Sequence, residues 1–167
     1  MNTTTIKIEQ QLEKEIASIL KQSPSGNEFS KSFLENLTFS NFLSDKMLII
    51  GVIRQGVPAS LFQLIQKNTP FSINDWAKIL DISSKSLFRY IQESRHFKTN
   101  QSERIIEMAE VTHLGLEVFG SMEKFRLWLD TPNFALGNIQ PKELLRDSYG
   151  KELVMGELTR INYGILA

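Results

Sequence analysis

The stretch SINDWAKILDISSKSLFRYIQES, residues 72–94, decides the fold class because it predicts two short helices joined by a tight corner. Ser72 is a favourable N-cap residue, and Asp75 follows three residues later, where the helix dipole favours an acid. Residues 81–83 form the corner, which Ile82 is expected to fill. Each helix has an apolar face at helical spacing, made by Trp76, Ala77 and Leu80, then by Leu87, Tyr90 and Ile91. Two helices joined by such a turn indicate a helix-turn-helix.

The second helix of this pair carries residue types that suit DNA. The positions expected to be exposed are Ser84, Lys85, Ser86 and Arg89. Hydroxyl and cationic groups near a helix start fit phosphate oxygens and base edges in a major groove. Basic residues also outnumber acidic ones across residues 85–104. We therefore predict a DNA-binding helix. Two alternatives stay open: a helical hairpin that only packs, and a helix-turn-helix that no longer binds DNA.

The N-terminal segment predicts an amphipathic helix, because apolar residues recur every four positions among Glu, Gln and Lys. These residues are Ile8, Leu12, Ile16 and Leu20. The helix is expected to end at the Ser, Pro and Gly cluster of residues 23–26. Its apolar face could dock on the rest of the chain or serve as an oligomerisation arm, and the sequence favours neither.

The middle of the chain also reads as helix. Residues 27–55 are largely apolar without strict alternation, although residues 47–53 alone could form a strand. Ser60 and Ser102 are predicted to begin two further helices. Gly120 is expected to end the second of these, and Ser121 to cap the helix that follows.

The stretch WLDTPNFALGNIQPKELL, residues 128–145, concentrates turn signals that are sparse elsewhere. Pro132 ends one helix, Gly137 permits a reversal and Pro141 begins the next helix. Residues 134–136 are expected to pack the connection. We interpret this stretch as a rigid joint that sets the direction of the final helix.

The final helix is predicted after a break at Gly150 and is expected to stop at Gly164. Its buried face is expected to contain Val154, Leu158 and Ile161. The helices before and after the joint make the chain all-α, because no segment predicts a sheet.

Composition excludes several function classes. The chain has 167 residues, no cysteine, and 19 basic residues balanced by 19 acidic ones, so DNA binding must come from a local patch. His96 and His113 lack partners at ligand spacing, so no metal site is predicted. No phosphate loop or catalytic set is present, and we predict no enzyme, no catalytic residue and no cofactor. With neither a signal peptide nor an apolar span, a cytoplasmic protein without a membrane partner is expected.

The C-terminal third carries a specific pattern. It runs through Val118-Phe119-Gly120, Trp128-Leu129, Thr131-Pro132-Asn133, Ala135-Leu136-Gly137, Pro141, Leu144-Leu145, Gly150, Val154, Leu158, Arg160-Ile161, Tyr163-Gly164 and Ala167. This pattern resembles the Xre-type antitoxins of the Xre/MbcA/ParS family, the partners of RES-domain toxins. The likeness extends back to about residue 47. Asp147 departs from it, standing where the family usually has threonine.

The resemblance implies an antitoxin of a type II toxin–antitoxin pair. Its C-terminal end would block a RES-type toxin that degrades NAD or transfers ADP-ribose, and its helix-turn-helix would bind operator DNA of its own operon. The residues assigned to toxin binding are Arg160, Asn162, Tyr163, Gly164, Ile165, Leu166 and Ala167. Arginine suits carboxylates or phosphates, and tyrosine is an amphipathic anchor.

We therefore expect an all-α chain in which an Xre/Cro-like helix-turn-helix domain precedes a small helical toxin-binding domain. Residues 1–26 would be the N-terminal helix and linker, residues 27–101 the helix-turn-helix domain, and residues 102–167 the toxin-binding domain. A homodimer is expected because such readers usually contact two half-sites. The alternative is a helix-turn-helix transcription regulator with a dimerising C-terminal domain and no toxin partner.

Overall fold

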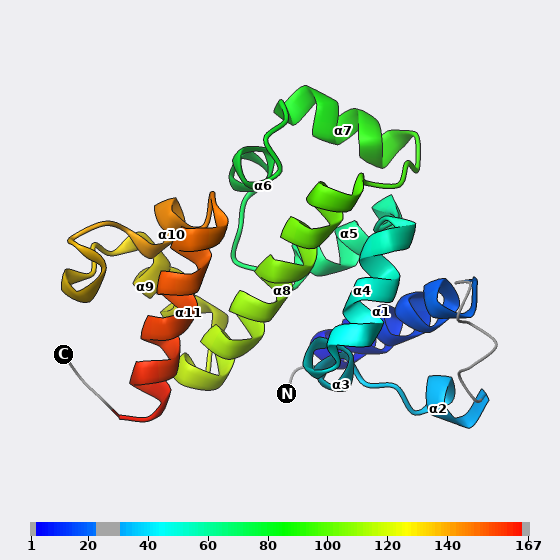
Figure 1. Cartoon of the computed structure of the whole chain (residues 1–167), viewed down its shortest axis with the longest axis horizontal. Coiled ribbons are helices and arrows are strands. Elements are labelled where there is room, and N and C mark those ends of the chain that lie inside the picture. Colours follow the sequence, from blue (N-terminus) through cyan, green and yellow to red (C-terminus); the bar gives the residue numbers. More distant parts are fainter. Residues whose placement is uncertain (1–2, 23–30, 165–167) are drawn as a thin grey trace. The chain divides into compact units, whose positions relative to one another are not determined.

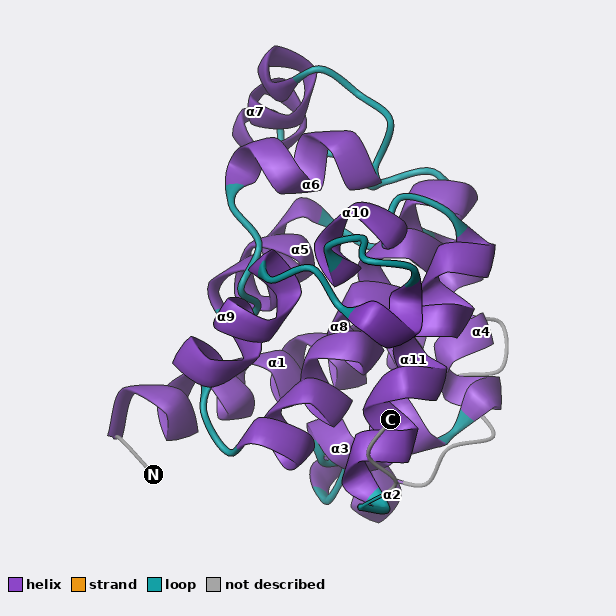
Figure 2. Ribbon diagram, turned by 90° about the vertical axis from the view of Figure 1, so that its left-hand side faces the viewer, coloured by secondary structure: helices purple, strands orange, loops and turns teal. Residues whose placement is uncertain are grey.

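The computed structural model of the chain describes residues 3–22 and 31–164, and their regular structure is helical (Figures 1 and 2). Two isolated β-bridges, Pro58 with His96 and Asn133 with Ile139, are the only strand-like pairings in these ranges. No helix within them is long and apolar enough to cross a membrane. The elements are α1 (Thr3–Gln22), α2 (Lys31–Glu35), α3 (Phe39–Ser44), α4 (Lys46–Gln55), α5 (Ala59–Lys67), α6 (Ile73–Ile79), α7 (Ser84–Gln92), α8 (Thr99–Phe119), α9 (Met122–Asp130), the 3-10 helix η2 (Phe134–Leu136), α10 (Pro141–Leu144) and α11 (Ser148–Asn162).

The helices form two compact units that do not follow chain order. Residues 1–68 and 84–107 make the first unit, and residues 69–83 and 108–167 make the second. The two helices of the helix-turn-helix are thereby divided, with α6 in the second unit and α7 in the first. The domain boundary expected between residues 101 and 102 falls inside the continuous helix α8.

In the first unit, α1 packs against α3, α4 and α5. Leu12, Ile16 and Leu20 of its apolar stripe are completely or almost completely buried. Of the two readings that the sequence left open, the structure shows the helix docked on its own unit. The segment that could have been a strand, residues 47–53, lies in α4, because Asp45 accepts hydrogen bonds from the amides of Met47 and Leu48 and so caps a helix there.

Two predicted helix starts in this unit are wrong. The helix α5 begins at Ala59 after Pro58, and the Ser60 hydroxyl instead donates to the Glu15 carboxylate of α1. The helix α8 begins at Thr99, three residues before Ser102. Ser102 is buried, and its hydroxyl accepts a 2.8 Å hydrogen bond from the Val57 amide. Serine has the chemistry of a cap, but here its hydroxyl joins segments far apart in sequence.

In the second unit, the ring of Phe125 on α9 stacks beside those of Phe119 and Trp128. Gly115 of α8 lies against the Phe125 ring, so close that a β-carbon would come within 2.4 Å of it. The Lys151 ammonium of α11 pairs with the Glu110 carboxylate of α8 at 3.3 Å. Aromatic packing and this ion pair therefore fix α9 and α11 on the C-terminal half of α8.

The start of the last helix differs from the prediction. Gly150 does not separate two helices as predicted. It lies buried in the first turn of α11, which begins at Ser148. Asp147 is the N-cap, and its carboxylate accepts a 2.8 Å hydrogen bond from the Gly150 amide. Aspartate and threonine both cap helices, so this departure from the family pattern preserves the local structure.

The predicted helix ends are confirmed. Gly120 and Gly164 adopt positive φ angles of 72° and 70°, and their amides donate to the carbonyls of Leu116 and Ile161. Ser121 accepts from the Lys124 amide as the predicted N-cap of α9. These features depend on a few neighbouring residues, which is why the sequence alone could place them.

Candidate functional site

The corner between α6 and α7 is built from local hydrogen bonds. The Ser72 hydroxyl accepts from the Asp75 amide while the Asp75 carboxylate accepts from the Ser72 amide, which completes the capping box. At the other end of α6 the Ile82 amide donates to the Ala77 carbonyl at 3.0 Å. Asp81 takes the left-handed conformation there, with a φ of 52°. Aspartate tolerates this conformation better than most residues, so the turn forms without the glycine that is frequent in such corners.

The helix α7 turns one face to solvent. Leu87 is completely buried, whereas Lys85 and Arg89 are exposed, and Ser84 and Ser86 are half-buried. A shallow groove on this face is lined by Lys85, Ser86, Phe88, Arg89, Gln92 and Glu93. The structure thus brings Lys85, Ser86 and Arg89 of the predicted DNA-binding residues together, while Ser84 lies outside the groove.

Two residues of this groove were missed by the sequence reasoning. Phe88 is 51% exposed, and Gln92 is exposed one turn later. Both lie near Lys85 on the helix surface, at positions i+3 and i+7. That spacing could have identified Gln92, but Phe88 is apolar and would ordinarily be assigned to the core.

The second candidate surface lies along α11, opposite its buried residues Val154 and Leu158. Helical spacing places a row of exposed residues on one side of this helix, namely Tyr149, Leu153, Gly156, Arg160 and Tyr163. Tyr149 and Tyr163 are 82% and 77% exposed, which is unusual for large aromatic side chains. We call these five residues the α11 stripe. Tyr149, Leu153 and Gly156 were not among the predicted site residues, because only packing shows which side of the helix faces solvent.

The predicted toxin-binding residues lie at and beyond the end of this stripe. The Arg160 guanidinium is half-exposed and donates to the nearly buried Glu157 carboxylate at 3.2 Å. Asn162 and Gly164 are exposed beside Tyr163. Ile165, Leu166 and Ala167 lie outside the described residues. Glu157 therefore orients the arginine while leaving part of it accessible.

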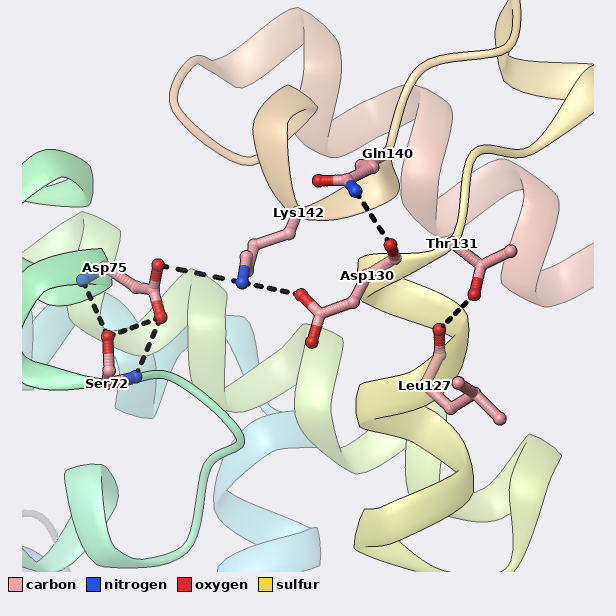
Figure 3. A network of polar contacts seen from close by, with 7 residues as sticks. All are labelled: Ser72, Asp75, Leu127, Asp130, Thr131, Gln140 and Lys142. Atoms are coloured by element: carbon pink, nitrogen blue, oxygen red, sulfur yellow. Dashed lines mark hydrogen bonds and ion pairs between the residues drawn. The ribbon is translucent and has the colours of Figure 1, made fainter.

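The joint between α9 and α10 is held by a polar network (Figure 3). Lys142 of α10 pairs with Asp130 of α9 at 2.5 Å and with Asp75 of α6 at 3.8 Å. The Gln140 side chain donates to the Asp130 carbonyl at 2.8 Å. All of these residues belong to the second unit, so the first helix of the helix-turn-helix is tied to the joint.

Packing within the joint differs from the expectation that residues 134–136 fill the connection. Leu136 is buried, but Phe134 is 83% exposed and Ala135 is also exposed. Gly137 makes the predicted reversal with a φ of 74°, and Pro141 begins α10 as predicted. Hydrogen bonds rather than apolar side chains hold most of this turn.

The capping box and the joint together set the charge state of Asp75. Partial burial opposes ionisation, but hydrogen bonds from Ser72 and the positive charges of Lys142 and Lys78 outweigh it, so the pKa of Asp75 lies below its ordinary value of 3.8. A carboxylate whose pKa is lowered on folding stabilises the folded state at pH values above its unfolded-state pKa. This contribution is lost as the pH falls through the folded-state pKa.

Replacing Asp75 by asparagine is therefore expected to lower the free energy of unfolding by about 0.5–1 kcal/mol at pH 7, the usual worth of a charge at a helix N-terminus. The gap between wild type and variant should begin to narrow below about pH 4 and should close once the pH has fallen below the lowered folded-state pKa, because the wild-type carboxyl is then also neutral. Urea denaturation of both proteins at several pH values measures this gap.

Glu152→Gln, an exposed position on α11, is the matched control and should show little difference at any pH. A gap between Asp75→Asn and wild type that stays constant from pH 7 to pH 3 would contradict the lowered pKa.

Two family models match the chain, in the same order as the features described above. The antitoxin Xre-like helix-turn-helix domain matches residues 49–110, and the antitoxin Xre/MbcA/ParS C-terminal toxin-binding domain matches residues 114–164. The chain is thus a helix-turn-helix protein with a C-terminal toxin-binding domain, and it belongs to the Xre/MbcA/ParS antitoxins. Membership of this family confirms the prediction of a binding protein rather than an enzyme.

Two individual proteins illustrate the likeness. Antitoxin Xre of Photorhabdus laumondii subsp. laumondii is 26% identical over 118 residues, which cover 70% of this chain and 80% of that protein. A chain of the crystal structure of the M. tuberculosis MbcT–MbcA toxin–antitoxin complex has a similar fold, with a TM-score of 0.53 and 21% identity. That match covers 65% of this chain and 96% of the other.

Proposed function

We propose that this protein is the cytoplasmic antitoxin of a type II pair and that it binds and blocks a RES-type toxin. The toxin would degrade NAD or transfer ADP-ribose, and residues 160–167 would obstruct access to its active site. The observation that carries the proposal is the α11 stripe, which lies within the region matched by the toxin-binding family model and leads to these residues.

The chemistry of the α11 stripe suits a protein partner. Tyr149 and Tyr163 offer large amphipathic surfaces, which are enriched at the centres of protein interfaces. Gly156 has no atom within 4 Å of where a β-carbon would lie, so another backbone can approach closely there. Arg160 offers donors for a carboxylate or a phosphate group. These features together fit a cleft that binds a nucleotide substrate.

We further propose that the helix-turn-helix binds operator DNA of the same operon, as a homodimer that contacts two half-sites. Support comes from the exposed Lys85 and Arg89 on α7 and from the match to the Xre-like helix-turn-helix domain. The alternative is a transcription regulator with a dimerising C-terminal domain. It would bind DNA in the same way but would have no toxin partner.

Co-expression with the product of the adjacent gene, which the proposal expects to be a RES-domain toxin, tests the antitoxin proposal. Cells that express the toxin alone should stop growing and lose NAD or accumulate ADP-ribosylated protein. Cells that also express this chain should grow normally, and the two proteins should co-purify. Growth arrest in the presence of this chain, without co-purification, would contradict the proposal and favour the regulator without a toxin.

A further inference from the structure

The exposed face of α7, the helix labelled in Figure 1, combines two cationic side chains with an aromatic ring. Lys85, Phe88, Arg89 and Gln92 fall within about one third of the helix circumference, on the side away from the buried Leu87. A helix face that is only solvated and binds no partner would not need an exposed phenylalanine between two cations. The arrangement instead offers two cations for the phosphates of a DNA backbone. It also offers two further side chains, Phe88 and Gln92, for base edges in the groove.

Phe88 has one good match among base edges in a major groove. Only thymine presents a methyl group there, and apolar side chains contact it. The ring is 51% exposed and lies in the shallow groove of α7, so it can reach a partner without a change of fold. Phe88 would therefore favour thymine over cytosine at a base that it met.

Gln92 favours the other base of such pairs. A glutamine amide can accept a hydrogen bond from the N6 amino group and donate one to N7 at the same time only on adenine. Gln92 lies one turn beyond Phe88, about 6 Å along the helix axis, which is less than two base steps of about 3.4 Å each. With α7 lying along the major groove, the two side chains would meet neighbouring base pairs.

The acidic residue of the groove does not oppose this reading. Glu93 forms an ion pair with Arg95, whose guanidinium also lies 5.7 Å from the centroid of the Tyr90 ring. Its charge is therefore largely compensated, and Lys85 and Arg89 remain to contact phosphates.

We propose that Phe88 and Gln92 read two adjacent A·T base pairs at the centre of each operator half-site, with Phe88 on a thymine methyl and Gln92 on an adenine. Lys85 and Arg89 position the helix on the phosphates. This inference rests on the proposed DNA binding and adds the bases that are read.

The test begins with selection of duplexes from a random library by the full chain, purified with its toxin if the two co-purify. Each thymine of the selected half-site is then replaced in turn by deoxyuridine, which lacks the methyl group. Wild-type affinity should fall about fourfold at one thymine, as expected for one buried methyl. Phe88→Ala should bind both duplexes equally. Replacing the neighbouring adenine by 7-deaza-adenine should lower the DNA affinity of the wild-type protein about tenfold. The same replacement should change the affinity of Gln92→Ala very little.

Two variants serve as controls. Phe134→Ala removes another exposed ring, from the joint and not from α7, and should leave both preferences unchanged. Lys85→Ala should weaken binding to every sequence and lower the salt slope by about 1, without changing the preference for thymine.

Three results would overturn the inference. Specific binding without a deoxyuridine effect, or with the same effect in Phe88→Ala, excludes Phe88 as the reader and leaves DNA binding intact. A selected half-site without adjacent A·T pairs excludes the proposed bases. Binding without any sequence preference removes the proposed operator function as well.

Discussion

Replacing Gly150 by alanine is expected to lower the free energy of unfolding by about 3 kcal/mol, at the upper end of the usual cost of overpacking. A β-carbon at Gly150 would lie 1.9 Å from the Leu144 carbonyl oxygen and 2.7 Å from its carbon. These are backbone atoms at the end of α10, and they cannot rotate away as a flexible side chain could. The start of α11 must shift instead, which disturbs the Asp147 cap. Urea or thermal denaturation of the full chain measures the loss.

Gly156→Ala is the matched control because it makes the same substitution in the same helix. No atom lies within 4 Å of the added β-carbon, and alanine is the better helix former by about 0.5–1 kcal/mol. This variant should therefore be more stable than wild type. Equal effects of the two substitutions would show that helix propensity, and not the contact with Leu144, governs Gly150.

Truncation after Leu158 is expected to abolish neutralisation of the toxin. Val154 and Leu158 are completely buried and remain in the truncated chain, so the second unit should keep its core. The residues removed include the exposed Arg160 and Tyr163, the end of the α11 stripe. Toxin-expressing cells should then stop growing as if no antitoxin were present, and the truncated chain should not co-purify with the toxin.

A full-length double variant, Arg160→Ala with Tyr163→Ala, separates lost contacts from lost folding. It keeps α11 intact and should still weaken neutralisation strongly, because anchoring tyrosine and arginine side chains dominate many interfaces. Circular dichroism of both proteins is the control that tests whether each is folded. Full survival of cells that carry either folded form would show that the inhibitory contacts lie elsewhere.

Local signals made much of this fold predictable. The capping box of Ser72 and Asp75, the cap at Ser121 and the stops at Gly120 and Gly164 depend on residues within one helical turn. The apolar periodicity of residues 8–20 likewise predicted the buried stripe of α1. Such features are encoded by adjacent side chains and the backbone, and a single sequence contains them completely.

Features that depend on distant residues were not predictable. Gly150 looks like a helix breaker until the Leu144 carbonyl is seen against it. Ser102 looks like a cap until Val57 is found at its hydroxyl. The exposure of Phe88 and Tyr149 follows from which side of each helix its neighbours cover. The periodicity marks a face, and only the tertiary structure decides how far that face is buried.

The division of the helix-turn-helix has a consequence for how such genes can recombine. Segment 69–83, with α6, packs with residues 108–167, whereas α7 packs with residues 1–68. An exchange of the C-terminal third alone would remove Lys142, which pairs with Asp75 of α6, and Asp130, which pairs with Lys142 in turn. We therefore expect a chimera to be more stable when it inherits residues 69–83 together with its toxin-binding segment. Recombination at the border between the two matched family domains would yield a protein whose α6 keeps its local cap but lacks the ion pair between Asp75 and Lys142.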